Sequence, residues 1–285
     1  MTPHRPAPAM RRPKNLSPAA RIGFVAMCLS LLTAFFNPLL AALPLLIFIF
    51  VCLAASLMPT TSFFLPVVSR GSPEKGAVAL TFDDGPNPAS TPQLLELLSK
   101  YGAAATFYVN GCRAEKHPEL IREIVSQGHA IGNHSYSHDN FIMLKSSAAL
   151  KEEIVKTQRV LGRLGVLPHT FRPPVGVTNP KLGNILDQLD MFAVNFSRRA
   201  GDRGNRQVSN LSRKILKRLR SGDIVMLHDI WPQDDAKARH WLMEVERILS
   251  GIQDKHLKIL PLATLIDCPV MDVSEHWPTD PKATP

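Results

Sequence analysis

From residue 76 onward the sequence alternates short apolar runs of strand length with amphipathic patterns of helical period. This alternation is typical of an α/β domain built on parallel strands. Seven strands are predicted, at residues 77–82, 104–109, 130–133, 170–172, 192–196, 223–227 and 257–260. Helices are predicted between them, at residues 91–101, 118–127, 148–164, 180–189, 208–219 and 236–249.

Polar residues follow directly on several of these predicted strands. They are Asp83 with Asp84, then His134, Arg172 and His228. An open doubly wound sheet would give the same alternation of elements. A barrel is favoured because the carboxyl ends of its strands converge on one face, where such folds do their chemistry. The predicted fold is therefore a distorted (β/α) barrel with about seven parallel strands.

Residues 22–58 contain no charged side chain, and a stretch of this length and composition belongs in a bilayer. Asn37-Pro38 divides it into residues 22–36 and 39–58, which predicts either a helical hairpin or one kinked helix that crosses the membrane. A cleavable signal peptide is disfavoured, since the apolar stretch is longer than a usual signal core and lacks a clear cleavage site.

The topology decides on which side of the membrane the following domain lies. In the slightly favoured hairpin, both ends lie on one side, and the basic tail would place that side in the cytosol. That tail contains Arg5, Arg11, Arg12, Lys14 and Arg21. A single crossing would export the domain instead. The expected location is a bacterial-type inner membrane, with the side left open.

Five segments are therefore expected. They are a basic tail at residues 1–21, a transmembrane segment or hairpin at 22–58, a linker at 59–75, a catalytic domain at 76–267 and a polar tail at 268–285.

The formal charge of +9 could suggest a nucleic-acid partner. However, Lys and Arg are dispersed, and no aromatic residues accompany a basic patch. The densest run, residues 213–220, has the spacing of a solvated helix face. The expected macromolecular partner is the lipid bilayer, with no nucleic acid.

Two motifs indicate a metal site. The sequence T-F-D-D-G-P places Asp83 and Asp84 at the mouth of the first strand, where a cation would relieve the repulsion between the carboxylates, although an Asx-type turn is an alternative. His134 and His138 stand at i and i+4, so on a helical turn they would face the same way and bind one ion. Two imidazoles and one carboxylate would leave positions open for activating water.

These motifs, in this order, resemble the polysaccharide deacetylase family, also called the NodB homology domain or carbohydrate esterase family 4. The resemblance covers residues 76–267 and implies a distorted barrel with seven strands. It also implies that Asp84, His134 and His138 bind the metal, and that Asp83 is the general base.

A third family element appears as Arg172-Pro173-Pro174-Val175-Gly176, with Val175 in place of the usual aromatic residue. The resemblance implies that Arg172 orients Asp83 and that Pro174 and Val175 contact the substrate. The backbone N–H of Val175 would help to hold the oxyanion.

Two further family elements follow in the sequence. Asp202 is the best match to a degraded fourth element, with a solvated loop aspartate as the alternative. A fifth element ends at His228, which the resemblance makes the general acid, while Leu227 would line the pocket for the acetyl methyl group. The pKa of an ordinary histidine lies near the working pH, which suits this role.

The expected function is metal-dependent hydrolysis of the N-acetyl group, or a related acyl group, of an amino sugar. One divalent ion is expected, most simply Zn, with Co, Ni or Mn also accepted by such ligands. The expected substrate is a glycan or a lipid-linked saccharide. The alternatives are a deformylase of a lipid-linked sugar and a non-catalytic, membrane-anchored carbohydrate-binding protein.

Overall fold

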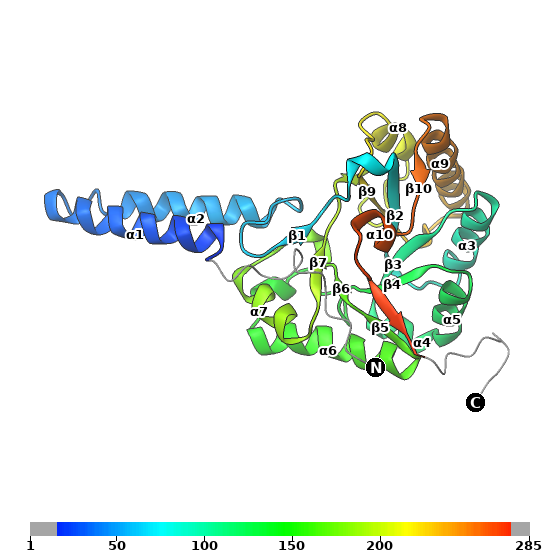
Figure 1. The fold of residues 1–285 in the computed structure, drawn as a ribbon, viewed down its shortest axis with the longest axis horizontal. Coiled ribbons are helices and arrows are strands. Elements are labelled where there is room, and N and C mark those ends of the chain that lie inside the picture. The colour runs from blue at the N-terminus through cyan, green and yellow to red at the C-terminus, as the bar shows by residue number, and fades with distance from the viewer. Residues whose placement is uncertain (1–15, 275–285) are drawn as a thin grey trace.

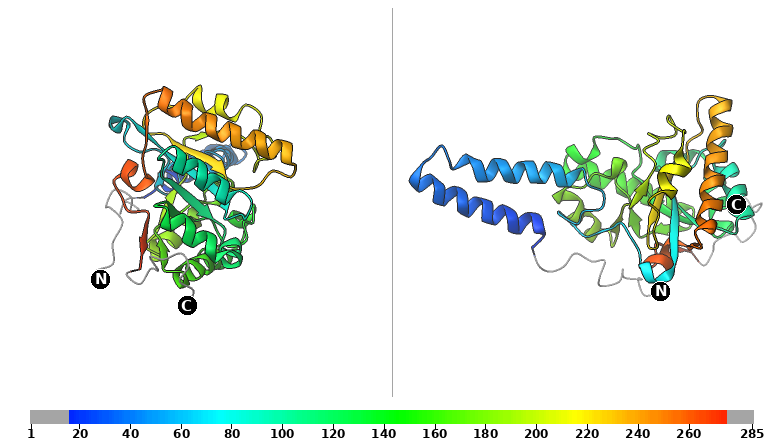
Figure 2. Two further views of the ribbon diagram at one scale, coloured as in Figure 1. Left: turned by 90° about the vertical axis from the view of Figure 1, so that its right-hand side faces the viewer. Right: turned by 90° about the horizontal axis from the view of Figure 1, so that it is seen from above.

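The structure, a computed structural model, describes residues 16–274 and begins with two apolar helices that lie side by side (Figures 1 and 2). Helix α1 spans Pro18–Phe36 and α2 spans Ala42–Ser56. Ser17 caps α1, and the chain turns at Asn37, where the sequence predicts a break. Among the described residues, α1 alone is long and apolar enough to cross a membrane, since α2 has 15 residues. We call this pair the hairpin.

The hairpin helices contact each other closely but leave most of their large apolar side chains exposed. The Ser30 hydroxyl donates to the Ala41 carbonyl at 2.7 Å, and Gly23 lies against the ring of Phe48, where a Cβ would come within 2.8 Å of the ring. Leu31 and Phe35 are 70% and 87% exposed. Such apolar surfaces are unusual in contact with water.

The domain that follows is built on a curled parallel sheet. Its strands are β1 (Val67–Val68), β2 (Ala77–Gly85), β3 (Ala105–Val109), β4 (Ala130–Asn133), β6 (Thr170–Phe171), β7 (Phe192–Val194), β8 (Arg198–Arg199), β9 (Ile224–His228) and β10 (Lys258–Ile259). The order is β1-β7-β6-β4-β3-β2-β9-β8, with β10 also paired to β2, and every pair in this sheet is parallel. The sequence therefore predicts the parallel sheet correctly.

The sheet curls because one short stretch of chain, residues 192–199, pairs with strands near both ends of the strand order. Strand β7 pairs with β6, and after three intervening residues β8 pairs with β9, near the other end of the strand order. The Ser197 amide donates to the Ile224 carbonyl at 3.1 Å between these two pairings. Residues 192–199 thus bring the two sides of the sheet together, as a distorted barrel requires.

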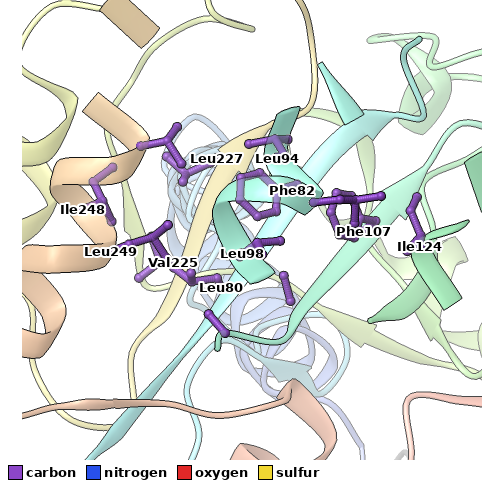
Figure 3. Close-up of a cluster of buried hydrophobic side chains, with 14 of the residues drawn as sticks. Leu80, Phe82, Leu94, Leu98, Phe107, Ile124, Val225, Leu227, Ile248 and Leu249 are labelled. Atoms are coloured by element: carbon purple, nitrogen blue, oxygen red, sulfur yellow. The ribbon is translucent and has the colours of Figure 1, made fainter. Parts of the chain in front are cut away.

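Helices pack around the outside of this sheet. They are α3 (Thr91–Lys100), α4 (Gly111–Lys116), α5 (Pro118–Ser126), α6 (Ser147–Arg163), α7 (Pro180–Gln188), α8 (Leu211–Leu216), α9 (Asp235–Asp254) and α10 (Leu262–Ile266). Leu80 and Phe82 of β2 point toward these helices and pack on Leu94 and Leu98 of α3, in a core that Figure 3 shows. Ala77 and Ala79, on the opposite face of β2, belong to a separate cluster with Met226. The period of two along each strand therefore separates an outer from an inner set of side chains.

Several boundaries differ from the sequence predictions. Strand β2 continues to Gly85, and α8 covers only residues 211–216 because Asn210 takes a left-handed conformation, which no helix can include. The expected linker is packed, since Phe63 and Phe64 are buried.

Two further strands, β5 (Val166–Pro168) and β11 (Met271–Val273), form a small antiparallel sheet. The first part of the expected polar tail is thus ordered, and residues 275–285 lie outside the described residues. Strands this short give no detectable period in sequence.

Candidate metal centre and active site

The polar residues that follow the predicted strands meet at one end of the sheet. Asp83 and Asp84 lie within the last residues of β2, and His228 ends the neighbouring strand β9, where it pairs with Asp83. His134 follows β4 and Arg172 follows β6. Because all these strands are parallel, their carboxyl ends share one edge, which confirms the convergence that the barrel hypothesis requires.

Asp84, His134 and His138 form a cluster with the donor atoms of a metal site. One ligand atom from each lies within 4.8 Å of the others. The Nε2 atoms of His138 and His134 are 2.9 Å and 3.6 Å from Asp84 Oδ1. Three such donors converging on one point fit a tetrahedral ion with an open position.

The tautomer of His134 also supports a metal site. Its Nδ1 lies 2.7 Å from the Arg172 carbonyl, which can only accept, so Nδ1 carries the proton and Nε2 presents its lone pair to the cluster. Burial lowers the pKa of His134, which keeps the imidazole neutral as a ligand must be. Burial alone would raise the pKa of Asp84, but the hydrogen bond and the charge of His138 hold it below its usual range. The residues present therefore fit a divalent cation.

The two histidines do not stand on a helical turn, as their spacing suggested. Residues 134–138 form a loop in which Ser135 and His138 have φ of 66° and 55°. Glu153 of α6 holds this loop by accepting hydrogen bonds from the amides of Tyr136 and Ser137, at 3.0 Å and 2.7 Å. The loop still brings the imidazole ring centroids within 5.0 Å of each other.

Arg172 binds Asp83 in a fully buried ion pair. Its Nη1 donates to Asp83 Oδ1 at 2.6 Å and to Thr81 Oγ1 at 2.7 Å. Its Nε and Nη2 donate to the carbonyls of Val194 and Asn195. The guanidinium also stacks 4.0 Å from the ring centroid of Tyr108. Asp83 Oδ2 is left facing the metal cluster, 4.0 Å from His134 Nε2.

His228 is paired with Asp202. The Nδ1 of His228 lies 2.9 Å from Asp202 Oδ2, and Asp202 is buried. Burial alone lowers the pKa of His228, but the hydrogen bond and charge of Asp202, with the charges of Asp84 and Asp83, raise it to about 9. The structure therefore brings the weakest sequence candidate, Asp202, to the site, and a solvated loop position is excluded.

Pro174 and Val175 lie on the loop that follows Arg172 and borders the site. Pro174 is buried, while Val175 is 53% exposed and has φ of 54°. A β-branched residue rarely adopts this left-handed conformation, and such strain is typical of functional loops.

Leu227 lies elsewhere than the resemblance implied. It is 1% exposed and packs in the outer core with Phe82 and Leu94 (Figure 3). Met226 belongs instead to the inner cluster. It stands two residues before His228 and so shares that residue's face of β9. Counting back in steps of two from His228 would have identified Met226 from the sequence.

Several supporting residues escaped the sequence analysis. Thr81, Tyr108 and Asn195 all contact Arg172. Thr81 opens the T-F-D-D-G-P motif, which gives it no role of its own, and Tyr108 and Asn195 lie in predicted strands that carry no motif. Asp229 accepts hydrogen bonds from the hydroxyls of Ser90 and Thr91 at 2.6 Å and 2.5 Å. A cavity of about 870 Å³ between α3 and α5 is lined by none of the site residues.

The fold and the site together define an α/β domain of the NodB type, with a metal-site triad beside an Asp–Arg and a His–Asp pair. A sequence profile described as Polysaccharide deacetylase matches residues 70–194. A peptidoglycan-N-acetylglucosamine deacetylase of Bacillus cereus is 35% identical over 154 residues, which is 53% of this chain and 72% of the relative. The chain belongs to the polysaccharide deacetylase family.

Other relatives agree with this assignment. A chitooligosaccharide deacetylase of Azorhizobium caulinodans is 32% identical over 171 residues, 59% of this chain and 80% of the relative. A crystal structure of a peptidoglycan N-acetylglucosamine deacetylase superposes with a TM-score of 0.66 at 27% identity, covering 72% of this chain and 94% of that one. A family 4 carbohydrate esterase from Streptomyces lividans, in complex with acetate, gives 0.57 at 32% identity and covers 65% and 91%.

Proposed function

We propose that this chain is a membrane-anchored, metal-dependent hydrolase that removes the acetyl group from the nitrogen of an amino sugar. The observation that carries this proposal is the convergence of Asp84, His134 and His138 beside the Asp83–Arg172 and His228–Asp202 pairs. Deacetylases of peptidoglycan and chitooligosaccharides among the relatives support the substrate class, a glycan or saccharide that contains amino sugars. The apolar hairpin supports the anchor.

Each residue has a role in this proposal. When bound at Asp84, His134 and His138, a divalent ion such as Zn would polarise the acyl carbonyl and make a water molecule more acidic. Asp83, oriented by Arg172 through Oδ1, accepts a proton from that water on Oδ2. The backbone N–H of Val175 donates to the oxygen that gains negative charge.

His228 completes the reaction as general acid. Asp202 holds its Nδ1, so Nε2 is the nitrogen that faces the substrate and protonates the leaving amine. Met226 shares the face of β9 that bears His228, and Pro174 follows Arg172 by two residues, so these two side chains would contact the acyl group and the sugar.

The proposal is tested by acetate release from short N-acetylglucosamine oligomers, using the full chain in detergent. We expect release that stops after treatment with a chelator and returns when Zn, Co, Ni or Mn is added back. Release that persists in the metal-depleted protein would contradict the metal dependence. A protein that binds the ion but releases no acetate or formate from any acylated amino sugar would favour a binding role.

Replacing Asp202 with Asn is expected to move the alkaline limb of the pH–activity profile to lower pH. The general acid must be protonated, so activity is lost as pH rises through the pKa of His228, which is about 9 with Asp202 in place. Without the carboxylate that raises it, this pKa falls toward the ordinary value of about 6.5, and kcat at pH 8 falls about tenfold or more. An unchanged alkaline limb in Asp202→Asn, measured from pH 5 to 10, would contradict the pairing.

A further inference from the structure

The end of the hairpin bonds directly to the loop that borders the metal centre. The Thr178 amide donates to the Ser56 carbonyl, at the last residue of α2, at 3.4 Å. Asn195 Nδ2 donates to the carbonyls of Pro59 and Gly176, at 2.9 Å and 3.2 Å. At its other end, the same loop begins at Arg172, whose carbonyl holds His134. The hairpin and the metal centre therefore share one loop.

A second loop connects the metal centre to the hairpin from the other side. It starts at the ligand His138 and continues through the short helix η3 (Ile142–Leu144). Ile142 and Met143 are buried in a cluster that also contains Ala19 of α1 and Ala55 of α2. Both loops beside the metal centre thus lie at the base of the hairpin.

These two loops expose large apolar side chains. Phe141, Leu144 and Val175 are 69%, 81% and 53% exposed, and we call them the apolar rim. After Met58, the described residues contain two other exposed large apolar side chains, Leu167 and Met243, and both are less exposed, at 50% and 47%. Single exposed apolar residues need no explanation, but these three stand on two loops that bond to each other, since Asn179 Nδ2 donates to the Met143 carbonyl at 2.7 Å.

Exposed apolar side chains also stand at the base of the hairpin. Leu57 and Met58, which follow α2, are 71% and 53% exposed and lie in the chain between Ser56 and Pro59, whose carbonyls accept the hydrogen bonds described above. Figure 1 and the right-hand view of Figure 2 show the hairpin projecting away from the domain, so its base marks where the domain meets the membrane. A surface at that depth lies in the headgroup region, which favours exposed aromatic and aliphatic side chains.

We propose that the apolar rim rests in the membrane interface, so that the active site takes its substrate from the membrane surface, as an amino sugar attached to a lipid. This inference rests on the proposed deacetylase function and selects between its two substrate classes. With the rim at the interface, a sugar carried on a membrane lipid reaches the metal centre without leaving the headgroup layer. A soluble glycan must instead reach the metal centre from the water beside the bilayer.

The test compares two matched pairs of substitutions in the full chain, reconstituted in lipid vesicles. Phe141→Ser with Leu144→Ser removes rim side chains, and Leu167→Ser with Met243→Ser removes two exposed apolar side chains elsewhere on the domain. One substrate is N-acetylglucosamine joined through a diphosphate to a polyprenol in the same vesicles, and the other is a soluble N-acetylglucosamine oligomer. We expect the rim pair to lower acetate release from the lipid substrate about tenfold, the effect of roughly 1.4 kcal/mol of lost interaction.

The rim pair should leave release from the soluble oligomer unchanged, and the control pair should change neither activity. Equal losses on both substrates, or no loss on either, would overturn the inference. If the unaltered protein releases acetate from neither substrate, the deacetylase function fails and the rim is judged by a separate measurement.

That measurement is the depth of the rim in the membrane. Tryptophan fluorescence of Phe141→Trp, corrected for that of the unaltered chain, should be quenched by brominated lipids, while that of Leu167→Trp should not. Equal quenching at the two positions would contradict a rim in the interface. Shielding of position 141 that depends on protein concentration would also contradict it, because that result indicates contact with a second copy of the chain.

Discussion

Replacing Asp83 with Asn is expected to lower kcat by about 10²- to 10⁴-fold, the usual contribution of a general base. The amide has nearly the same shape as the carboxylate but cannot accept a proton from the attacking water. Bound metal should persist, because Asp83 is not one of the three clustered ligands. The measurements are the rate of acetate release and the metal content of the purified protein.

The neighbouring residue supplies the matched comparison. Asp84→Asn should lose both metal and activity, since Asp84 Oδ1 is the atom on which the two imidazoles converge. If Asp83→Asn loses the metal while Asp84→Asn retains it, then Asp83 is the metal ligand and Asp84 is the general base, the reverse of the proposed assignment. Melting temperatures of both variants separate these effects from unfolding, because Asp83→Asn also removes the partner of a buried arginine.

The sequence predicts which motif residues meet where these residues follow strands. Asp83, Asp84, His134 and His228 come together because parallel strands end at one edge, and each predicted strand lies within a few residues of the observed one. The path of the loops between them is not predictable in this way. The left-handed conformation of Asp84, with φ of 73°, depends on contacts made by the folded chain.

Asp202 and Leu227 show two further limits. Asp202 lies in a loop with no recognisable pattern, and its pairing with His228 becomes evident only in the folded chain. Leu227 was placed by resemblance, although the alternation along β9 turns it outward and turns Met226 inward. Local period was the better guide here, because side-chain direction in a strand follows from backbone geometry.

The contacts between the hairpin and the domain are the hardest to predict from the sequence. Residues 59–75 have the composition of a linker, yet Phe63 and Phe64 are buried, and Pro59 bonds to Asn195. These contacts join segments more than a hundred residues apart, so no local pattern reports them. They nevertheless decide how the catalytic face is oriented relative to the apolar helices.

Replacing Arg172 with Met is expected to reduce the free energy of unfolding by about 3–5 kcal/mol, the cost of leaving a buried charge without its partner. Arg172 is fully buried and joins Asp83 and Thr81 on β2 to the carbonyls of Val194 and Asn195. It therefore links two strands that are not neighbours in the sheet. Urea denaturation of the full chain in detergent, followed by near-ultraviolet circular dichroism, measures the loss.

Arg199→Met is the matched control, because Arg199 is exposed and its substitution should change stability by less than about 0.5 kcal/mol. The double variant Arg172→Met with Asp83→Asn should recover part of the stability, since neither charge is then left buried alone. If Arg172→Met costs no more than Arg199→Met, or if the double variant is no more stable than Arg172→Met alone, the ion pair does not hold the barrel around the site.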